Sequence, residues 1–305
     1  MNIRSFVALV IFSCVLIVAP NVYSTELYFI DAHSQADQDI DRDELLERMA
    51  AAGVRKTILS SRRRRPAFDV ADWAAAHPDR LIASVRVKSK HYTNNTRKFY
   101  KKIKKQVNSD HFNTMSEMLL YHAQKGQQAN EVIVYPDNEH VSTLLDAARA
   151  QGWPLVIHIE FAALHGDMRR EMYDKMLSLV TEYPDQPFCL IHMGQLDASA
   201  VAGLLQKNQN LYFMTSHSNP IAVQRSNQPW VNMFQGKELA PDWKSLVIKH
   251  PDRFIFALDN VWAEQWRNGY KEQVDLWRHA LQALPADVAH AVAHGNAERL
   301  WHISK

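Results

Sequence analysis

The sequence predicts one domain in which strands and helices alternate and close into a (β/α)8 TIM barrel. Three observations support this: eight short apolar runs have strand character, helical patterns separate them, and no repeat, Gly/Ser linker or low-complexity tract interrupts them. Strands that are apolar on both faces are typical of a parallel sheet covered by helices, and eight such units close a barrel. The chain has 305 residues, 47% of them hydrophobic, which is enough for one large core.

Residues 1–24 are predicted to be a separate segment, a secretory signal peptide. Arg4 lies near the start, and an apolar run covers 6–19. This run is shorter than the ~20 residues that a membrane-spanning helix needs, which favours cleavage near Ser24 over an uncleaved anchor. We therefore expect residues 25–305 to form an exported barrel, periplasmic or secreted, with no stable membrane insertion after cleavage.

The eight strands are predicted in order along the remaining chain. They are "LYFIDAH" (27–33), "KTILSS" (56–61), "LIASVRV" (81–87), "EVIVYP" (131–136), "PLVIHIE" (154–160), "FCLIHMG" (188–194), "LYFMTSH" (211–217) and "FIFALDN" (254–260). Helical patterns separate them. In the first, at 41–53, Leu45, Leu46 and Met49 make an apolar face and Gly53 ends the helix.

Two intervals between strands are longer than a simple βα unit requires, and extended loops are predicted there. One follows the third strand at 88–130, and the other follows the seventh strand at 218–253. Both begin at the carboxyl ends of the strands. The second carries Trp230 and Phe234 among polar residues, and we expect it either to close over a substrate as a lid or to pack as an extra helix.

Polar side chains stand at the carboxyl ends of the apolar strands, which is the side of such a barrel that carries the chemistry. Three strands end in histidine, at His33, His158 and His192, and the eighth ends in Asp259. A lone histidine at a strand end is more often a satisfied core residue. Three histidines and a carboxylate around one axis, however, bring together the ligands and proton acceptors of a metal or acid–base site.

The order of these motifs resembles the amidohydrolase superfamily. The motifs are Asp-x-His on the first strand, "VIHIE" on the fifth, "LIHMG" on the sixth, "FALDN" on the eighth and the closing "HGNAERLW". The nearest likeness is to the amidohydrolase-related group that includes aminocarboxymuconate semialdehyde decarboxylase and the dicarboxylate lactonases. The resemblance implies that His33, His158 and Asp259 are metal ligands, that Asp259 accepts the proton of an attacking water, and that His192 is a second catalytic residue.

One position departs from the family pattern. Metal-dependent members carry His-x-His on the first strand, and here Gln35 replaces the second histidine. A glutamine offers a neutral oxygen, which suits harder ions and binds softer ones weakly. The resemblance therefore leaves two alternatives open. Either one divalent ion, Zn or a harder ion such as Mn, is held by His33, His158, Asp259 and Gln35, or Asp259 acts without a metal as the general base.

Basic residues near the predicted site indicate the kind of substrate. Arg86 ends the third strand, and "SSRRRRP" at 60–66 follows the second. Because guanidinium groups match carboxylates, we expect Arg86 to bind a small anionic molecule, while most of the arginine run is expected to be solvated. The lysines of 97–106 are expected on the outer face of a helix. A formal net charge of +2 gives no support to nucleic acid as a partner.

These features predict an exported hydrolase that acts on a C–O or C–N bond of a small, acidic molecule. A decarboxylase or other lyase of the same superfamily is the neighbouring alternative. A barrel that binds a ligand without converting it is the alternative from another class, and Gln35 is the residue that favours it. The sequence specifies neither the substrate nor the oligomeric state.

Overall fold

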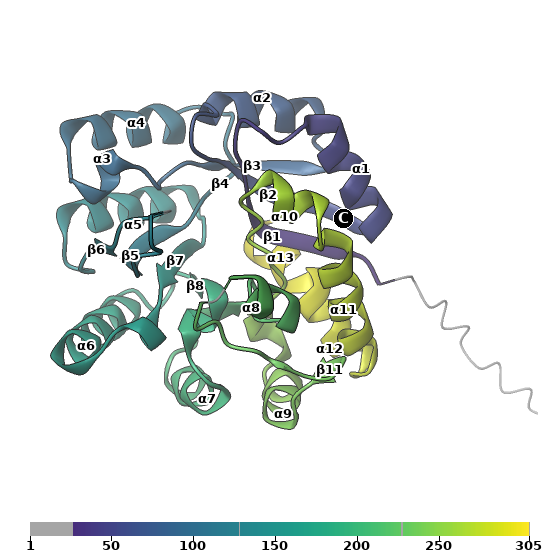
Figure 1. Cartoon of the computed structure of the whole chain (residues 1–305). Coiled ribbons are helices and arrows are strands. Elements are labelled where there is room, and N and C mark those ends of the chain that lie inside the picture. Colours follow the sequence, from purple (N-terminus) through teal and green to yellow (C-terminus); the bar gives the residue numbers. More distant parts are fainter. Residues whose placement is uncertain (1–26, 128, 227, 305) are drawn as a thin grey trace, which may run out of the picture.

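The computed structural model of the protein describes residues 27–304, with the exception of residues 128 and 227 (Figure 1). The segment predicted to be a signal peptide lies outside these described residues. Within them, no helix has the length and apolar character needed to cross a bilayer. The strands lie at the centre of the molecule and the larger helices surround them.

The strands form a barrel with eight positions, as predicted. They are β1 (Phe29–Ala36), β2 (Val54–Ser61), β3 (Leu81–Val85), β4 (Thr114–Met115) together with β5 (Met118–His122), β7 (Leu155–Ile159), β8 (Phe188–Leu190), β9 (Leu211–Met214) and β12 (Phe254–Ile255). Neighbouring positions pair in parallel. β4 and β5 occupy one position because β4 pairs with β3 while β5 pairs with β7.

Backbone hydrogen bonds between the first and the eighth position close the barrel. The amide of Asp259 donates to the carbonyl of His33 at 2.8 Å, and the amide of Gln35 donates to the carbonyl of Asn260 at 2.8 Å. The register of β1 against β2 shifts between Asp31 and Ser34, as at a β-bulge. This closing seam fixes the backbones of His33, Gln35 and Asp259 relative to one another.

Helices cover the outside of the barrel and its two ends. They are α1 (Arg42–Ala52), α2 (Ala67–Ala76), α3 (Lys90–Thr93), α4 (Arg97–Val107), α5 (Glu139–Gln151), α6 (Gly166–Glu182), α7 (Ala198–Lys207), α8 (Pro220–Ser226), α9 (Pro241–Lys249), α10 (Ala263–Arg267), α11 (Tyr270–Gln282), α12 (Ala286–His290) and α13 (Asn296–Leu300). Local chemistry sets their ends. Asp41 accepts a hydrogen bond from the amide of Glu44 at the start of α1, and Gly53 ends this helix with a φ of 69°.

Apolar side chains pack on both faces of the strands. The larger cluster lies between strands and helices and includes Phe29, Leu59 and Ile157. The smaller cluster includes Ile30 and Val156, at neighbouring positions whose side chains point to the opposite face. Helix α13 brings further apolar residues to this second cluster. The carboxyl ends of the strands are left to polar side chains.

The predicted fourth strand is wrong. Residues 114–122 occupy the fourth barrel position, whereas in 131–136 only β6 (Val132–Ile133) is a strand, and it pairs antiparallel with β5 outside the barrel. The segment "EVIVYP" has the β-branched composition of a strand, but "TMSEMLLYH" contains polar Ser116 and Glu117 in its middle. Both polar positions are buried: Glu117 contacts His158 and Gln35, and the Ser116 hydroxyl oxygen accepts a hydrogen bond from the amide of Val87.

The two long connections have different contents. The connection after β3 is shorter than predicted, because the fourth strand begins at Thr114, and it consists mainly of α3 and α4. Phe99 and Ile103 of α4 are buried while its lysines are exposed, as the helical pattern predicts. The connection after β9 is long, as predicted. It contains α8, a small hairpin of β10 (Phe234–Gln235) and β11 (Glu238–Leu239), and α9.

Candidate active site

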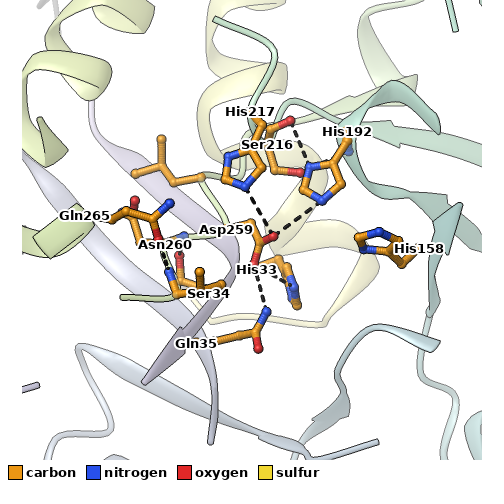
Figure 2. Close-up of polar contacts among 12 residues, drawn as sticks. His33, Ser34, Gln35, His158, His192, Ser216, His217, Asp259, Asn260 and Gln265 are labelled. Carbon is orange, nitrogen blue, oxygen red and sulfur yellow. Dashed lines mark hydrogen bonds and ion pairs between the residues drawn. The ribbon is translucent and has the colours of Figure 1, made fainter. Parts of the chain in front are cut away.

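The carboxyl ends of the strands surround a cavity of about 820 Å³. Figure 2 shows its polar centre, where side chains from the first, sixth and seventh strand positions point toward Asp259, which follows the eighth strand. Of the predicted site residues, His158, His192 and Asp259 line this cavity, and His33 and Gln35 contact Asp259. The structure therefore brings these five predicted residues together.

Asp259 is the centre of the site and is almost fully buried. Its Oδ1 atom lies 3.4 Å from Nε2 of His33, and its Oδ2 atom lies 3.4 Å from Nε2 of His192 and 3.6 Å from Nε2 of His217. Burial alone would raise the pKa of this carboxyl group, but the neighbouring His33 outweighs burial and holds the pKa below its ordinary value. Asp259 is therefore ionised at neutral pH.

Gln35, which the sequence predicts to be a metal ligand, contacts two carboxylates through its side-chain amide. Its side-chain nitrogen donates to Asp259 Oδ1 at 2.9 Å and to Glu117 Oε1 at 3.0 Å. Two carboxylates accept these bonds, so the amide group must turn its NH2 toward them, and its oxygen points elsewhere. Gln35 thus bridges two negative charges with a donor and offers no lone pair to a cation at this place.

His158, which the sequence predicts to be a metal ligand, is paired with two glutamates in this structure. Its Nδ1 lies 2.8 Å from Glu117 Oε2, and its Nε2 lies 3.0 Å from Glu160 Oε1. Ionised carboxylates accept hydrogen bonds, so both ring nitrogens must carry protons. Burial lowers the pKa of His158, but the two glutamates outweigh it and raise the pKa above the ordinary value. His158 is a buried imidazolium whose nitrogens have no free lone pair.

Two lysines neutralise the glutamates that hold His158. Lys88 contacts Glu117 Oε1 at 3.0 Å, and Lys125 contacts Glu160 Oε1 at 2.9 Å. Burial opposes ionisation of both glutamates, but these cations and His158 lower their pKa values below the ordinary range. Sequence reasoning missed the role of Glu117 because the strand that carries it was placed elsewhere. The sequence signal that could have revealed it is a pair of polar residues, Ser116 and Glu117, inside the short apolar run "TMSEMLLYH".

His192 and His217 form a stacked pair beside Asp259. Their ring centroids are 4.7 Å apart and their planes differ by 2°. Burial lowers the pKa of both rings, and each is neutral at neutral pH. Trp230, from the connection after β9, lies 4.6 Å from the His192 ring and 5.0 Å from the His217 ring. Trp230 therefore packs against both histidine rings, which agrees with a lid and equally with a packed segment.

Arg86, which the sequence predicts to bind the substrate, lies outside the lining of the cavity. Its guanidinium group donates to the carbonyl oxygens of Arg63, Arg65 and Lys88, and it is not among the residues that line the cavity. Arg86 therefore holds the loop after β2 in place. The cavity is instead lined by Arg62 from that loop, whose guanidinium carbon lies 3.8 Å from the centroid of the Trp262 ring.

The four predicted ligands, His33, Gln35, His158 and Asp259, do not together form a metal site in this structure. Gln35 and His158 are committed to carboxylates through their N–H groups, which leaves His33 and Asp259 of the four predicted residues. Nε2 of His33 is nevertheless buried without a hydrogen-bond partner, and so is Nε2 of His192. Orphaned imidazole nitrogens beside a carboxylate are ligands that divalent cations prefer. The ligand atoms of His192, His217 and Asp259 lie within 4.8 Å of one another, so the site fits a cation at the His192 side of Asp259.

A closed parallel barrel with buried histidines and carboxylates at the carboxyl ends of its strands defines an enzyme of the TIM-barrel class. A family profile described as Amidohydrolase matches residues 23–303. The chain belongs to this amidohydrolase family and is a hydrolase of that class. Among curated proteins, no relative of the chain is found.

Solved structures of low sequence identity share the fold. An uncharacterized TIM-barrel protein from Bordetella bronchiseptica is 18% identical with a TM-score of 0.57, covering 84% of this chain and 80% of that one. A probable 2-pyrone-4,6-dicarboxylic acid hydrolase from Acinetobacter baumannii, with citric acid bound, is 10% identical with a TM-score of 0.53, covering 90% and 99%. An amidohydrolase from Burkholderia multivorans, with bound Zn, is 12% identical with a TM-score of 0.55, covering 91% and 100%.

Proposed function

We propose that this protein hydrolyses a C–O or C–N bond of a small anionic molecule, with Asp259 accepting the proton of the attacking water. The observation that carries this proposal is the ionised Asp259 carboxylate at a polar cavity, with three imidazole rings around it. The negative charge of Asp259 beside a bound water gives the proton a place to go as the water attacks a carbonyl carbon.

Residues of the chain account for the charge that develops during such a reaction. The water oxygen bonds to the carbonyl carbon, its proton passes to Asp259, and the carbonyl oxygen becomes an oxyanion. The Lys88 ammonium has three donors, and its contact with Glu117 uses one, so it is suited to donate to the oxyanion. His158 contributes positive charge without a free N–H. The leaving oxygen or nitrogen then takes its proton from Asp259.

One divalent ion, Zn or a harder ion such as Mn, is part of this proposal. Beside Asp259 it would lower the pKa of a bound water, and this is the chemistry that such an ion supplies. The Zn in the Burkholderia multivorans amidohydrolase and the family membership of the chain support it. The His192 side of Asp259 is where the residues of this chain suit a cation.

Arg62 is the residue that we propose to bind the anionic part of the substrate. It lines the cavity, and the citric acid bound to the Acinetobacter baumannii structure supports an acidic ligand. Changing Arg62→Gln should raise KM roughly 10-fold or more, because a hydrogen bond to a charged group contributes about 1.5–3 kcal/mol. Arg64→Gln is the matched control, since the Arg64 side chain is exposed in the same loop. Equal effects of the two changes on KM would contradict this role.

A panel of lactones, amides and carboxylic acids tests the reaction type. Hydrolysis of a lactone or amide, followed as acid release at constant pH, is the expected result. Release of carbon dioxide instead would identify the lyase alternative. Binding of panel members without conversion, with metal added or removed, would identify the ligand-binding barrel.

We also propose export through residues 1–24, which lie outside the described part of the structure. The early Arg4 and the short apolar run at 6–19 support a cleaved signal. Amino-terminal sequencing of the mature protein should begin close to residue 25, in the periplasmic or secreted fraction. An intact Met1 end recovered from the membrane fraction would contradict cleavage.

A further inference from the structure

His192 faces Asp259 with a lone pair. Its Nδ1 lies 3.2 Å from the carbonyl oxygen of Ser216, which only accepts hydrogen bonds, so Nδ1 carries the proton. Nε2 is the remaining ring nitrogen, and it is buried without a hydrogen-bond partner, as expected of a ring nitrogen that holds a lone pair. Nε2 nevertheless lies 3.4 Å from Oδ2 of the Asp259 carboxylate. Two acceptor atoms thus face each other with no hydrogen between them.

His217 approaches the same oxygen. Its Nε2 lies 3.6 Å from Asp259 Oδ2, and the ligand atoms of His192, His217 and Asp259 all lie within 4.8 Å of one another. The three residues also share a left-handed backbone conformation, with φ values of 56°, 56° and 50°. Non-glycine residues rarely adopt this conformation, and clusters of such residues are typical of functional sites.

We propose that His192, His217 and Asp259 bind one divalent cation through two Nε2 atoms and Oδ2. A cation at this place converts two opposed acceptors into two ligands, and a set of two imidazoles and one carboxylate suits zinc. This ligand set replaces most of the one that the sequence predicts, and it leaves Gln35 and His158 to the carboxylates that they contact. The proposal deepens the proposed function and rests on it only for the use of the ion in the reaction.

Neighbouring groups hold the two histidines in this orientation. Besides accepting from Nδ1 of His192, Ser216 accepts from the His192 amide through its hydroxyl oxygen at 3.0 Å. A metal-binding histidine usually donates its other ring nitrogen in this way, which fixes the tautomer. Trp230 covers both rings from the side of the long connection after β9. Hydrogen bonds therefore fix the orientation of His192, and His217 packs against the His192 ring and Trp230.

Zinc binding by the full mature chain tests the proposal without any substrate. Chelator-treated protein should bind one equivalent of Zn²⁺ by calorimetry, and ¹⁵N-histidine spectra should show the Nε2 signals of His192 and His217 shifting on addition of Zn²⁺. Changing His217→Asn should weaken zinc binding by at least about 100-fold, since loss of a group that merely supports a ligand already costs about 10 to 100-fold.

His122→Asn is the matched control for these measurements. His122 lines the same cavity and stacks on His158 at 5.1 Å, but it belongs to a different group of candidate ligands, with His158 and Glu160. This change should leave zinc binding as it is, and Gln35→His should not strengthen it. Weaker binding in His122→Asn but not in His217→Asn, stronger binding in Gln35→His, or no binding by the unmodified protein would each overturn the proposal.

If a variant does not fold, the ¹⁵N-histidine spectra of the unmodified protein still identify the zinc ligands, because they need no substitution. Shifts confined to His33 and His158 would assign the ion to the set predicted from the sequence and overturn ours. Zinc bound at His192 and His217 together with no turnover of any panel member would uphold the metal site and count against the hydrolase. The two proposals therefore fail separately.

Discussion

Changing Asp259→Asn is expected to abolish turnover while leaving the barrel folded. An amide has the shape of the carboxylate but cannot take a proton from water, and general-base contributions are typically ~10² to 10⁴-fold. Loss of a metal ligand would push the effect toward the upper end. The measurement is the rate on any substrate found in the panel, together with a circular dichroism spectrum to verify the fold. His192→Asn should also lower the rate, by less.

The control for this change is Asp137→Asn, which alters an exposed aspartate whose partner is Lys175 on the surface. It should leave turnover at the level of the unmodified protein. If Asp259→Asn instead works at nearly the unmodified rate, the proton acceptor lies elsewhere in the cavity. The next residues to test would then be the lysines and histidines that also line the cavity, Lys88, Lys125, His122 and His158.

Changing His158→Gln is expected to lower the free energy of unfolding by about 3–5 kcal/mol, because breaking a buried ion pair leaves charge uncompensated. Here the carboxylates of Glu117 and Glu160 both lose a contact, at 2.8 and 3.0 Å respectively. Chemical denaturation at pH 7 measures the loss. In the double change with Glu160→Gln, the loss should be smaller than the sum of the two single losses, since the residues are coupled.

The pH dependence of stability gives this prediction a second measurement. The pKa of folded His158 lies above its unfolded value, so its contribution is complete below the unfolded pKa and is lost as the pH rises through the folded pKa. The free energy of unfolding of the unmodified protein should therefore fall as the pH rises from the unfolded to the folded pKa of His158. His158→Gln should lose less over the same range. Parallel curves for the two proteins would show that His158 is not an imidazolium in the folded state.

The sequence predicts the barrel because its pattern is repeated: strand, helix and strand again, with polar residues at one end. It fails at the fourth strand, where two polar residues interrupt the apolar run. Glu117 binds His158 and Gln35, while Ser116 accepts a hydrogen bond from the amide of Val87. The position where local composition misleads is thus a position in the site, as expected where function overrides propensity.

The identities of five site residues were predictable from the strand ends, but their roles were not. A histidine is a metal ligand or a cation according to the groups around it. His158 contacts two carboxylates, Glu117 from another strand and Glu160 two residues further along the chain. Likewise, Gln35 turns its NH2 inward because Glu117 and Asp259 both face it. Protonation and orientation depend on the folded environment, and neither is visible in the order of residues.

The closing seam between β1 and the residues after β12 has a consequence for how the site comes into being. Gln35 and Asp259 are 224 residues apart in the chain, yet they are direct partners. A nascent chain that has released its first strands from the ribosome still lacks the carboxylate that completes the site, and contacts of such long sequence separation form slowly. Catalytic competence should therefore appear late and all at once during synthesis, which leaves incomplete chains inert.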